Sequence, residues 1–243
     1  MSILGVLFDK DGTLVDFDAT WGPATHAIIR ALAAGDPELM RAQAEVLHFS
    51  LDEKRFRATS PAIAGSSASL GRLWGGALGR TDFAALKLEI DRLAAVESLK
   101  ALTPIGEPAR ALGALKAMGL RLGVATNDSE ASARRHIAAL GLEETIEFVA
   151  GYDSGHGGKP GPGMARAFAR HLGFAPGRIA VVGDSRDDLA AARAAGALAV
   201  AVLTGPAKRE ALAPLADHVV DGLEALPALF EALGAGARLA EGS

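Results

Sequence analysis

The sequence predicts an α/β protein built on a doubly wound, mostly parallel sheet that carries an inserted helical segment. Two observations lead to this prediction. From residue 103 onward, short apolar runs alternate with segments of helical periodicity, which is the rhythm of consecutive βαβ units. Between residues 16 and 99 that rhythm stops, and the chain is rich in alanine, leucine and charged residues without a clear strand pattern.

The predicted core elements follow in order along the chain. The strands are short apolar runs that end in turns, over 3–8, 120–125, 146–150, 179–182, 198–202 and, more weakly, 218–220. The helices have apolar residues at helical spacing, over 107–118, 130–140, 162–172 and 187–195. Asp128 or Ser129 is the candidate cap of the second helix, and a glycine follows each of the four helices at its end.

The segment 16–99 is predicted to be helical. Apolar spacing indicates one helix around Ile28, a second from Leu39 to Val46 with Phe49 as a candidate extension, and a third from residue 83 to 93. A structureless loop of this length inside a core is implausible, so we expect a helical cap domain over 16–99. The α/β core domain then comprises residues 1–15 and 100–243. The cap would lie over the edge where the first strand ends and could act as a lid.

Composition excludes several classes of protein. The chain has 243 residues, a net charge of −4 and 49% hydrophobic residues, which suits a soluble globular protein and gives no sign of a nucleic-acid surface. It has no cysteine, which excludes disulfides and thiolate metal sites. The first apolar run ends at Asp9, too early for a secretory signal or a membrane span. We therefore expect a cytoplasmic protein that binds neither membranes nor nucleic acid.

Polar side chains gather where the predicted strands end. They are Asp9 and Asp11 after the first strand, Thr126 and Asn127 after the second, Lys159 in a glycine-rich turn, and Asp184 and Asp188 after a later strand. In open α/β sheets, ligands bind at the carboxyl ends of the strands, so these side chains are expected to converge on one site.

The expected site suits phosphoryl transfer. Clustered carboxylates repel one another unless a cation neutralises them, and hard oxygen ligands favour Mg²⁺ paired with a substrate phosphate. Of Asp9 and Asp11, one carboxylate can attack as a nucleophile while the other moves protons. Lys159 and the Thr126 hydroxyl would hold the phosphate oxygens.

Four short motifs in this order carry a family resemblance. They are Asp9-Lys10-Asp11-Gly12-Thr13, then Thr126, then Lys159, and then residues 183–188. With them the chain resembles the haloacid dehalogenase superfamily of phosphohydrolases over residues 1–14 and about 103–225. The helical insertion between the first two motifs resembles the cap of the phosphoglycolate phosphatase-like branch. That branch also includes β-phosphoglucomutases and dehalogenases.

The resemblance implies catalytic and phosphate-binding roles. Asp9 would be the nucleophile that forms an aspartyl-phosphate, and Asp11 would protonate the leaving alkoxide and then deprotonate the hydrolytic water. Thr126, with the backbone of Asn127, would hydrogen-bond the transferring phosphoryl group. Lys159 would hold the nucleophile and the phosphate charges together.

The resemblance also implies a metal and a substrate class. Mg²⁺ would be bound by the Asp9 side chain, the Asp11 main-chain carbonyl and Asp184, with Asp188 ordering the metal-bound waters or Lys159. The partner would be a small phosphorylated metabolite, with 2-phosphoglycolate as the first candidate. The protein would be a monomer or a homodimer.

Two other functions remain open beside this phosphatase. A sugar phosphomutase would return the phosphoryl group to a sugar hydroxyl instead of water. A phospho-receiver or binding module would use the acidic pocket without turnover, but such modules lack the large insertion after the first strand. Asp11 argues against a dehalogenase, because attack on carbon does not need an acid at that position.

Several cap residues have competing interpretations. The basic group of Lys54, Arg55 and Arg57 would either meet a second anionic group of the substrate or form a solvated helix face, and the solvated face is favoured. Trp21 and Trp74 are expected to pack within the cap.

Overall fold

A six-stranded parallel sheet forms the centre of the protein. The computed structural model describes residues 2–63 and 67–235, except for the side chains of residues 67–69. The strand order is β5-β4-β1-β6-β7-β8, and every neighbouring pair is parallel. The strands are β1 (Gly5–Phe8), β4 (Arg121–Ala125), β5 (Phe148–Ala150), β6 (Ile179–Gly183), β7 (Leu198–Val202) and β8 (His218–Val220). The predicted α/β fold is confirmed.

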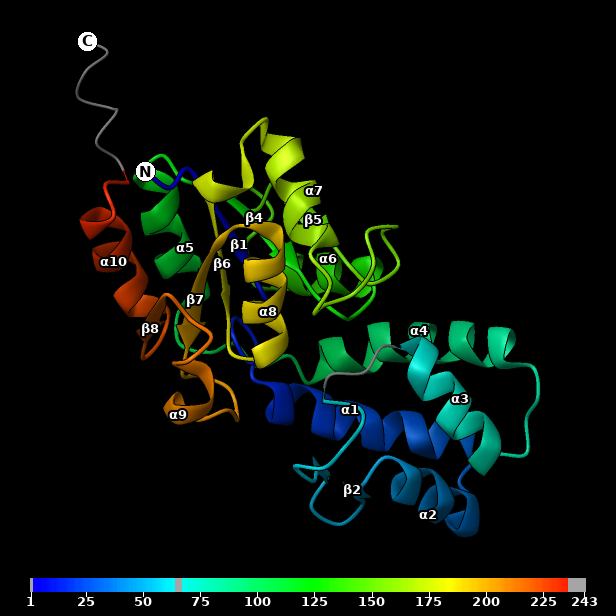
Figure 1. Ribbon diagram of the computed structural model, residues 1–243. Coiled ribbons are helices and arrows are strands. Elements are labelled where there is room, and N and C mark those ends of the chain that lie inside the picture. The colour runs from blue at the N-terminus through cyan, green and yellow to red at the C-terminus, as the bar shows by residue number, and fades with distance from the viewer. Residues whose placement is uncertain (1, 64–66, 236–243) are drawn as a thin grey trace.

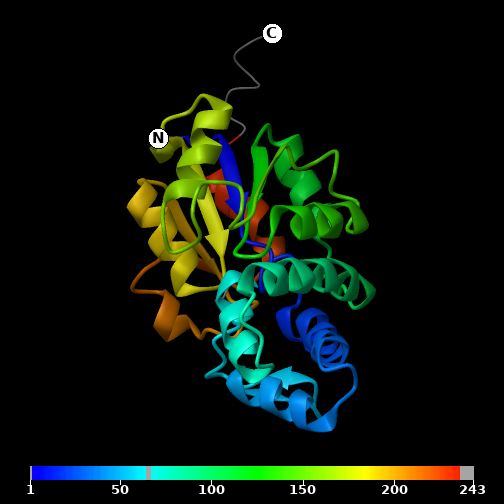
Figure 2. The same ribbon diagram turned by 90° about the vertical axis from the view of Figure 1, so that its right-hand side faces the viewer.

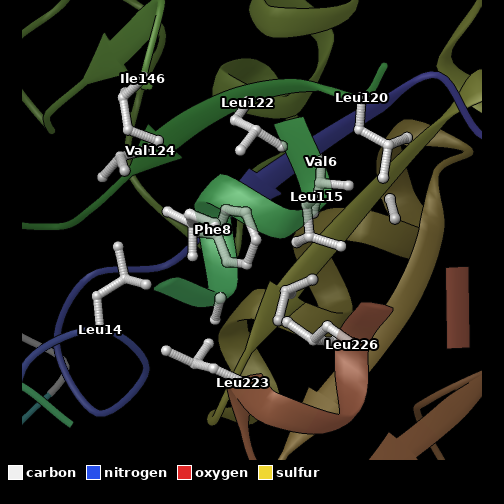
Figure 3. Close-up of a cluster of buried hydrophobic side chains, with 14 of the residues drawn as sticks. Val6, Phe8, Leu14, Leu115, Leu120, Leu122, Val124, Ile146, Leu223 and Leu226 are labelled. Carbon is white, nitrogen blue, oxygen red and sulfur yellow. The ribbon is translucent and has the colours of Figure 1, made fainter. Parts of the chain in front are cut away.

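Helices cover both faces of the sheet (Figure 1). On one face lie α5 (Pro108–Ala117), α6 (Glu130–Ala139) and α10 (Leu226–Ala232), and on the other lie α7 (Gly163–Leu172) and α8 (Arg186–Ala195). Figure 3 shows the first of these interfaces, in which Val6 and Phe8 of β1 pack among leucines of α5 and of the segment before α10. Shorter elements are α9 (Arg209–Leu212) and the 3₁₀ turns Pro176–Arg178 and Leu223–Ala225.

The helices and strands between Phe17 and Lys100 form a separate group beyond the carboxyl ends of the sheet strands (Figures 1 and 2). They are α1 (Phe17–Leu32), α2 (Pro37–Val46), the hairpin β2 (Phe49–Ser50) and β3 (Arg55–Phe56), α3 (Ser67–Ala77) and α4 (Phe83–Lys100). This group has its own apolar cluster around the buried Trp74, with Leu86 and Ile90 of α4 packed against it. Its core is thus distinct from the two clusters that cover the sheet.

The two segments that connect this helical group to the sheet run side by side. Val15 forms an antiparallel bridge with Pro104, and the Asp16 amide donates to the Thr103 carbonyl at 2.8 Å. The Ile105 amide donates in turn to the Leu14 carbonyl at 3.0 Å. The helical group therefore leaves and rejoins the core through one narrow paired connection.

The position of Phe49 differs from the sequence expectation, and the cap of α6, which the sequence left open between two residues, is resolved. Phe49 belongs to β2 and does not extend α2. The sequence did not indicate this strand, because two residues are too few to show an alternating pattern. Ser129, and not Asp128, caps α6 by accepting a hydrogen bond from the Ser132 amide. As predicted, glycines end α7 and α8: Gly173 and Gly196 adopt the left-handed conformation there, with φ of 69° and 81°. No helix in the described residues is long and apolar enough to cross a bilayer.

Candidate active site

The central strand β1 delivers Asp9 to the carboxyl edge of the sheet. Asp9 is 6% exposed, and its amide donates to the Val182 carbonyl at 2.8 Å, which continues the β1–β6 pairing by one residue. Gly12 then turns the chain with φ of +88°, and a Cβ at this position would collide with the carboxylate of Asp184. Glycine is required here for both its conformation and its lack of a side chain.

Lys159 binds two of the predicted acids. Its Nζ donates to Asp9 Oδ1 and to Asp188 Oδ1, the latter at 2.6 Å, and its side chain is 7% exposed. Burial by itself would lower the pKa of Lys159, but the charges of Asp188 and Asp9 hold it above its ordinary value. Asn127 fixes the lysine loop, because its side chain bonds both the Lys159 amide at 2.8 Å and the Lys159 carbonyl at 3.1 Å.

Asp188 has a structural task as well. With Ser185 it forms a capping box at the start of α8, in which Asp188 Oδ2 accepts from the Ser185 amide at 3.0 Å. Both of its carboxylate oxygens therefore have protein partners. Asp188 therefore holds Lys159 and the first turn of α8 together.

Three buried carboxylates face this single ammonium group. Ligand oxygens of Asp9, Asp184 and Asp188 all lie within 4.8 Å of one another. Burial raises the pKa of Asp9 to about 7 and that of Asp184 to about 8; the neighbouring carboxylates add to both rises, and Lys159 opposes them. This surplus of negative charge, presented by hard oxygen donors, fits a divalent cation.

Asp11 is held from three sides. Lys10 Nζ donates to it at 2.7 Å, Trp21 Nε1 of α1 donates to it at 2.6 Å, and the Thr126 hydroxyl lies 3.4 Å from Asp11 Oδ2. Burial by itself would raise the pKa of Asp11, but Lys10 and the Trp21 hydrogen bond hold it below its ordinary value. Asp11 is therefore ionised in the free protein.

A buried network behind Asp11 escaped the sequence analysis. Lys10 is 1% exposed and also contacts Asp128 Oδ2 at 3.3 Å and His136 Nδ1 at 3.2 Å. The Ser98 hydroxyl donates to the Ala94 carbonyl of α4 and lies 2.8 Å from His136 Nε2.

The contacts of the network fix the state of the imidazole. Because the Ser98 hydroxyl hydrogen is already engaged, His136 Nε2 is the donor to Ser98, and Nδ1 accepts from Lys10. Burial, together with the charge of Lys10, lowers the pKa of His136 to about 3, so the ring is neutral. The network thus runs from the helix α4 to the carboxylate of Asp11. A lysine between two acids was the only signal of it in the sequence.

The structure brings the predicted site residues together around one cavity of about 360 Å³. All of them line it: Asp9, Asp11, Thr126, Asn127, Lys159, Asp184 and Asp188. From the helical group, mainly apolar side chains line the opposite side, among them Phe17, Trp21, Ile28, Phe56, Trp74 and Ile90.

The basic group of the cap does not take part in this cavity. Lys54, Arg55 and Arg57 are exposed and are not among the described lining residues, and Arg55 instead pairs with Asp18 at 3.1 Å. Trp74 packs in the apolar cluster as expected, but it also lines the cavity, as does Trp21.

Comparisons with known proteins agree with this geometry. The family model of the haloacid dehalogenase-like hydrolases matches residues 3–196. A phosphoglycolate phosphatase from Rhodospirillum rubrum is 43% identical over 104 residues, and the match spans 43% of this chain and 43% of that protein.

Solved structures share the fold at low sequence identity. A Haemophilus somnus protein described as a phosphoglycolate phosphatase has a TM-score of 0.68 at 21% identity, over 94% of this chain and 98% of that one. A Thermotoga maritima protein described as a β-phosphoglucomutase has a TM-score of 0.67 at 20% identity, over 95% and 99% of the two chains. Since the family model covers most of the sequence and its motifs meet at one cavity, the chain belongs to the haloacid dehalogenase-like hydrolases.

Proposed function

We propose that this protein is a Mg²⁺-dependent phosphatase that hydrolyses a small phosphomonoester through an aspartyl-phosphate on Asp9. The observation that carries the proposal is the arrangement of Asp9. It is buried at the end of the central strand, bonded to Lys159, with the carboxyl group of Asp11 two residues further on. The names of the matched relatives make 2-phosphoglycolate the first substrate to assay.

We further propose that residues 16–99 are a cap domain on a core of residues 1–15 and 100–243. The separate apolar cluster around Trp74 supports this division, as does the paired connection between Val15 and Pro104. The cap would exclude water from the phosphoryl group while the substrate is bound.

In the first chemical step, an Asp9 carboxylate oxygen attacks phosphorus and the bond between phosphorus and the ester oxygen breaks. Asp11 gives its proton to the leaving alkoxide. Asp11 is ionised in the free protein, and the negative charge of a bound phosphate would favour the protonated form that this step needs. The Thr126 hydroxyl and Lys159 would hold the phosphoryl oxygens as their charge develops.

In the second step, Asp11 takes a proton from a water molecule that attacks the phosphorus of the aspartyl-phosphate. The bond between phosphorus and Asp9 breaks, which releases inorganic phosphate and restores the carboxylate. The side chains of Asp9 and Asp184 and the main-chain carbonyl of Asp11 would hold Mg²⁺, with Asp188 orienting its waters. The ion would offset the negative charge that gathers around the transferring group.

The proposed function is tested by phosphate release from a panel of phosphomonoesters with Mg²⁺ and with EDTA. We expect release that depends on Mg²⁺ and disappears with EDTA. The same panel includes a hexose 1-phosphate, because its conversion to the 6-phosphate without phosphate loss would identify a mutase instead. A stable phosphoryl-protein without turnover would identify a receiver module.

The metal proposal predicts that one substitution stabilises the metal-free protein and removes its stabilisation by Mg²⁺. Asp184→Asn removes one of three clustered carboxylates, so we expect the metal-free protein to melt at a higher temperature than the wild type. Saturating Mg²⁺ should stabilise the wild type by about 2–3 kcal/mol at a hundredfold excess over its dissociation constant, but not the variant. Thermal melts with Mg²⁺ and with EDTA measure both effects. An equal Mg²⁺ shift in the variant would rule Asp184 out as a ligand.

The role of Asp11 predicts a dependence on the leaving group. Asp11→Asn should slow hydrolysis of alkyl phosphates roughly 10²- to 10⁴-fold, because the alkoxide then leaves without a proton. The first step with p-nitrophenyl phosphate should be affected far less, since nitrophenolate is a good leaving group. Single-turnover rates for the two substrates measure the difference. An equal loss for both would contradict the acid role of Asp11.

A further inference from the structure

We propose that the cavity under the helical cap selects a phosphomonoester whose organic group is apolar and uncharged, such as an aryl or branched alkyl group. The proposal rests on the phosphatase function above and names the class of its substrate. It departs from the carboxymethyl group of 2-phosphoglycolate, which the names of the matched relatives suggest.

The cap side of the cavity is built from aromatic and aliphatic side chains. Phe17, Phe56 and Leu70 are half-buried and present apolar surface to the cavity, and the rings of Phe17 and Phe56 pack with centroids 5.3 Å apart. Behind them, Ile28, Trp74 and Ile90 are each at most 2% exposed. A surface of this kind gains free energy by covering apolar groups and gives no compensation for the desolvation of polar ones.

The indole groups do not add polar binding capacity. Trp21 Nε1 already donates to Asp11 at 2.6 Å, and Trp74 Nε1 donates to the Gln43 carbonyl at 3.3 Å. Thr25 supplies the one hydroxyl among the described cap residues that line the cavity. Against these described side chains a sugar would leave most of its hydroxyl groups without partners, so they do not favour a sugar phosphate.

The distribution of charge in the cavity also favours an uncharged organic group. In the described part of the chain, the cationic residues that line the cavity are Lys159 and Arg186, both from the core. Lys159 is bonded to Asp9 and Asp188. Arg186 lies at the exposed start of α8, beside Asp187. A substrate carboxylate that extended into the cap would therefore meet apolar groups without a cation, which is costly.

The phosphoryl group, a bound cation and the organic group share the volume of the cavity, because residues of both the core and the cap line it. Its volume of about 360 Å³ lies at the lower end of the range for small-molecule sites. At roughly 30 Å³ per water molecule, this is the space of about a dozen waters. A carboxymethyl group would leave the accessible parts of Phe17, Phe56 and Leu70 in contact with water, whereas an aromatic ring would cover them.

The first test compares benzyl phosphate with 2-phosphoglycolate on the wild-type protein with Mg²⁺, because both are esters of alcohols and their leaving groups are matched. We expect kcat/KM for benzyl phosphate to be higher by about tenfold or more, as burial of a ring predicts. A higher kcat/KM for 2-phosphoglycolate would overturn the inference while the phosphatase function stood. Loss of that preference in Arg186→Ala would then identify the core arginine as the carboxylate contact.

A pair of charge substitutions makes the test specific to the cavity. Ile63 lines the cavity and is 37% exposed, so Ile63→Arg adds a cation there with little risk to folding. We expect it to lower kcat/KM for benzyl phosphate and raise it for 2-phosphoglycolate. Leu88→Arg is the matched control, because Leu88 is 68% exposed on α4 and is not among the lining residues. Equal effects of the two substitutions would contradict the inference.

Binding can be measured apart from turnover. The chain has two tryptophans, and both line the cavity, so intrinsic fluorescence reports its occupancy. With Mg²⁺ present, we expect benzylphosphonate to change the fluorescence at lower concentration than 3-phosphonopropionate, about tenfold or more. The reverse order would overturn the inference. Tighter benzylphosphonate binding without phosphate release from any ester would uphold the cavity's preference and refute the phosphatase function.

Discussion

Asp9→Asn is expected to lower kcat for phosphomonoester hydrolysis by roughly 10³-fold or more, because an amide cannot replace the attacking carboxylate. The substitution keeps the shape of the side chain, so the packing at the end of β1 is retained. Lys159 keeps Asp188 as a partner, which avoids an unpaired buried cation. Steady-state phosphate release under saturating substrate and Mg²⁺ measures the effect, with circular dichroism to verify folding.

Asp18→Asn is the matched control for this experiment. Asp18 is an exposed carboxylate of α1 that pairs with Arg55 and does not line the cavity, so its loss is expected to leave kcat unchanged. Turnover by Asp9→Asn above about one hundredth of the wild-type value would show that Asp9 is not the nucleophile.

Lys10→Met is expected to destabilise the fold by about 3–5 kcal/mol, the usual cost of removing one partner of a buried ion pair. Lys10 is buried among Asp11, Asp128 and His136, and methionine fills a similar volume without the charge. Asp11 and Asp128 would then face a low-dielectric environment without a cation. Urea unfolding followed by circular dichroism measures the loss of stability.

A compensated variant separates the charge effect from packing. In Lys10→Met/Asp11→Asn/Asp128→Asn the unpaired carboxylates are gone, so much of the lost stability should return, while hydrolysis remains slow without Asp11. If Lys10→Met cost less than about 1 kcal/mol, or if the triple variant were no more stable than the single one, the network would not be the source of the stability.

Much of the core fold was predictable because its signals are local. The central strands are buried apolar runs, such as β1, which ends at Phe8 before Asp9, and glycines such as Gly173 end the helices. The hairpin β2–β3 was missed because its two-residue strands are too short for any periodic signal. The cap residue of α6 stayed open in the sequence, since Asp128 and Ser129 both have side chains that can cap a helix.

The site was predictable to the extent that its residues follow strand ends. The parallel topology alone brings Asp9, Thr126 and Asp184 to one edge, and the cavity contains all of them. The surroundings of Asp11 were not predictable, because they depend on tertiary packing. Trp21 of α1 donates to Asp11, and His136 of α6 contacts Lys10. The apolar character of the cap cavity likewise depends on which faces of its helices turn inward.

The central claim, a covalent phosphoryl group on Asp9, is tested most directly with the Asp11→Asn variant and p-nitrophenyl phosphate. Because this leaving group needs no proton but the attack of water still needs a base, the phosphoryl-enzyme should accumulate. The account predicts a burst of one nitrophenolate per active site and, after acid quench, a phosphoryl group on the peptide that contains Asp9. Linear release without a burst, with Asp9 unmodified throughout, would show that water attacks the substrate directly and would contradict the account.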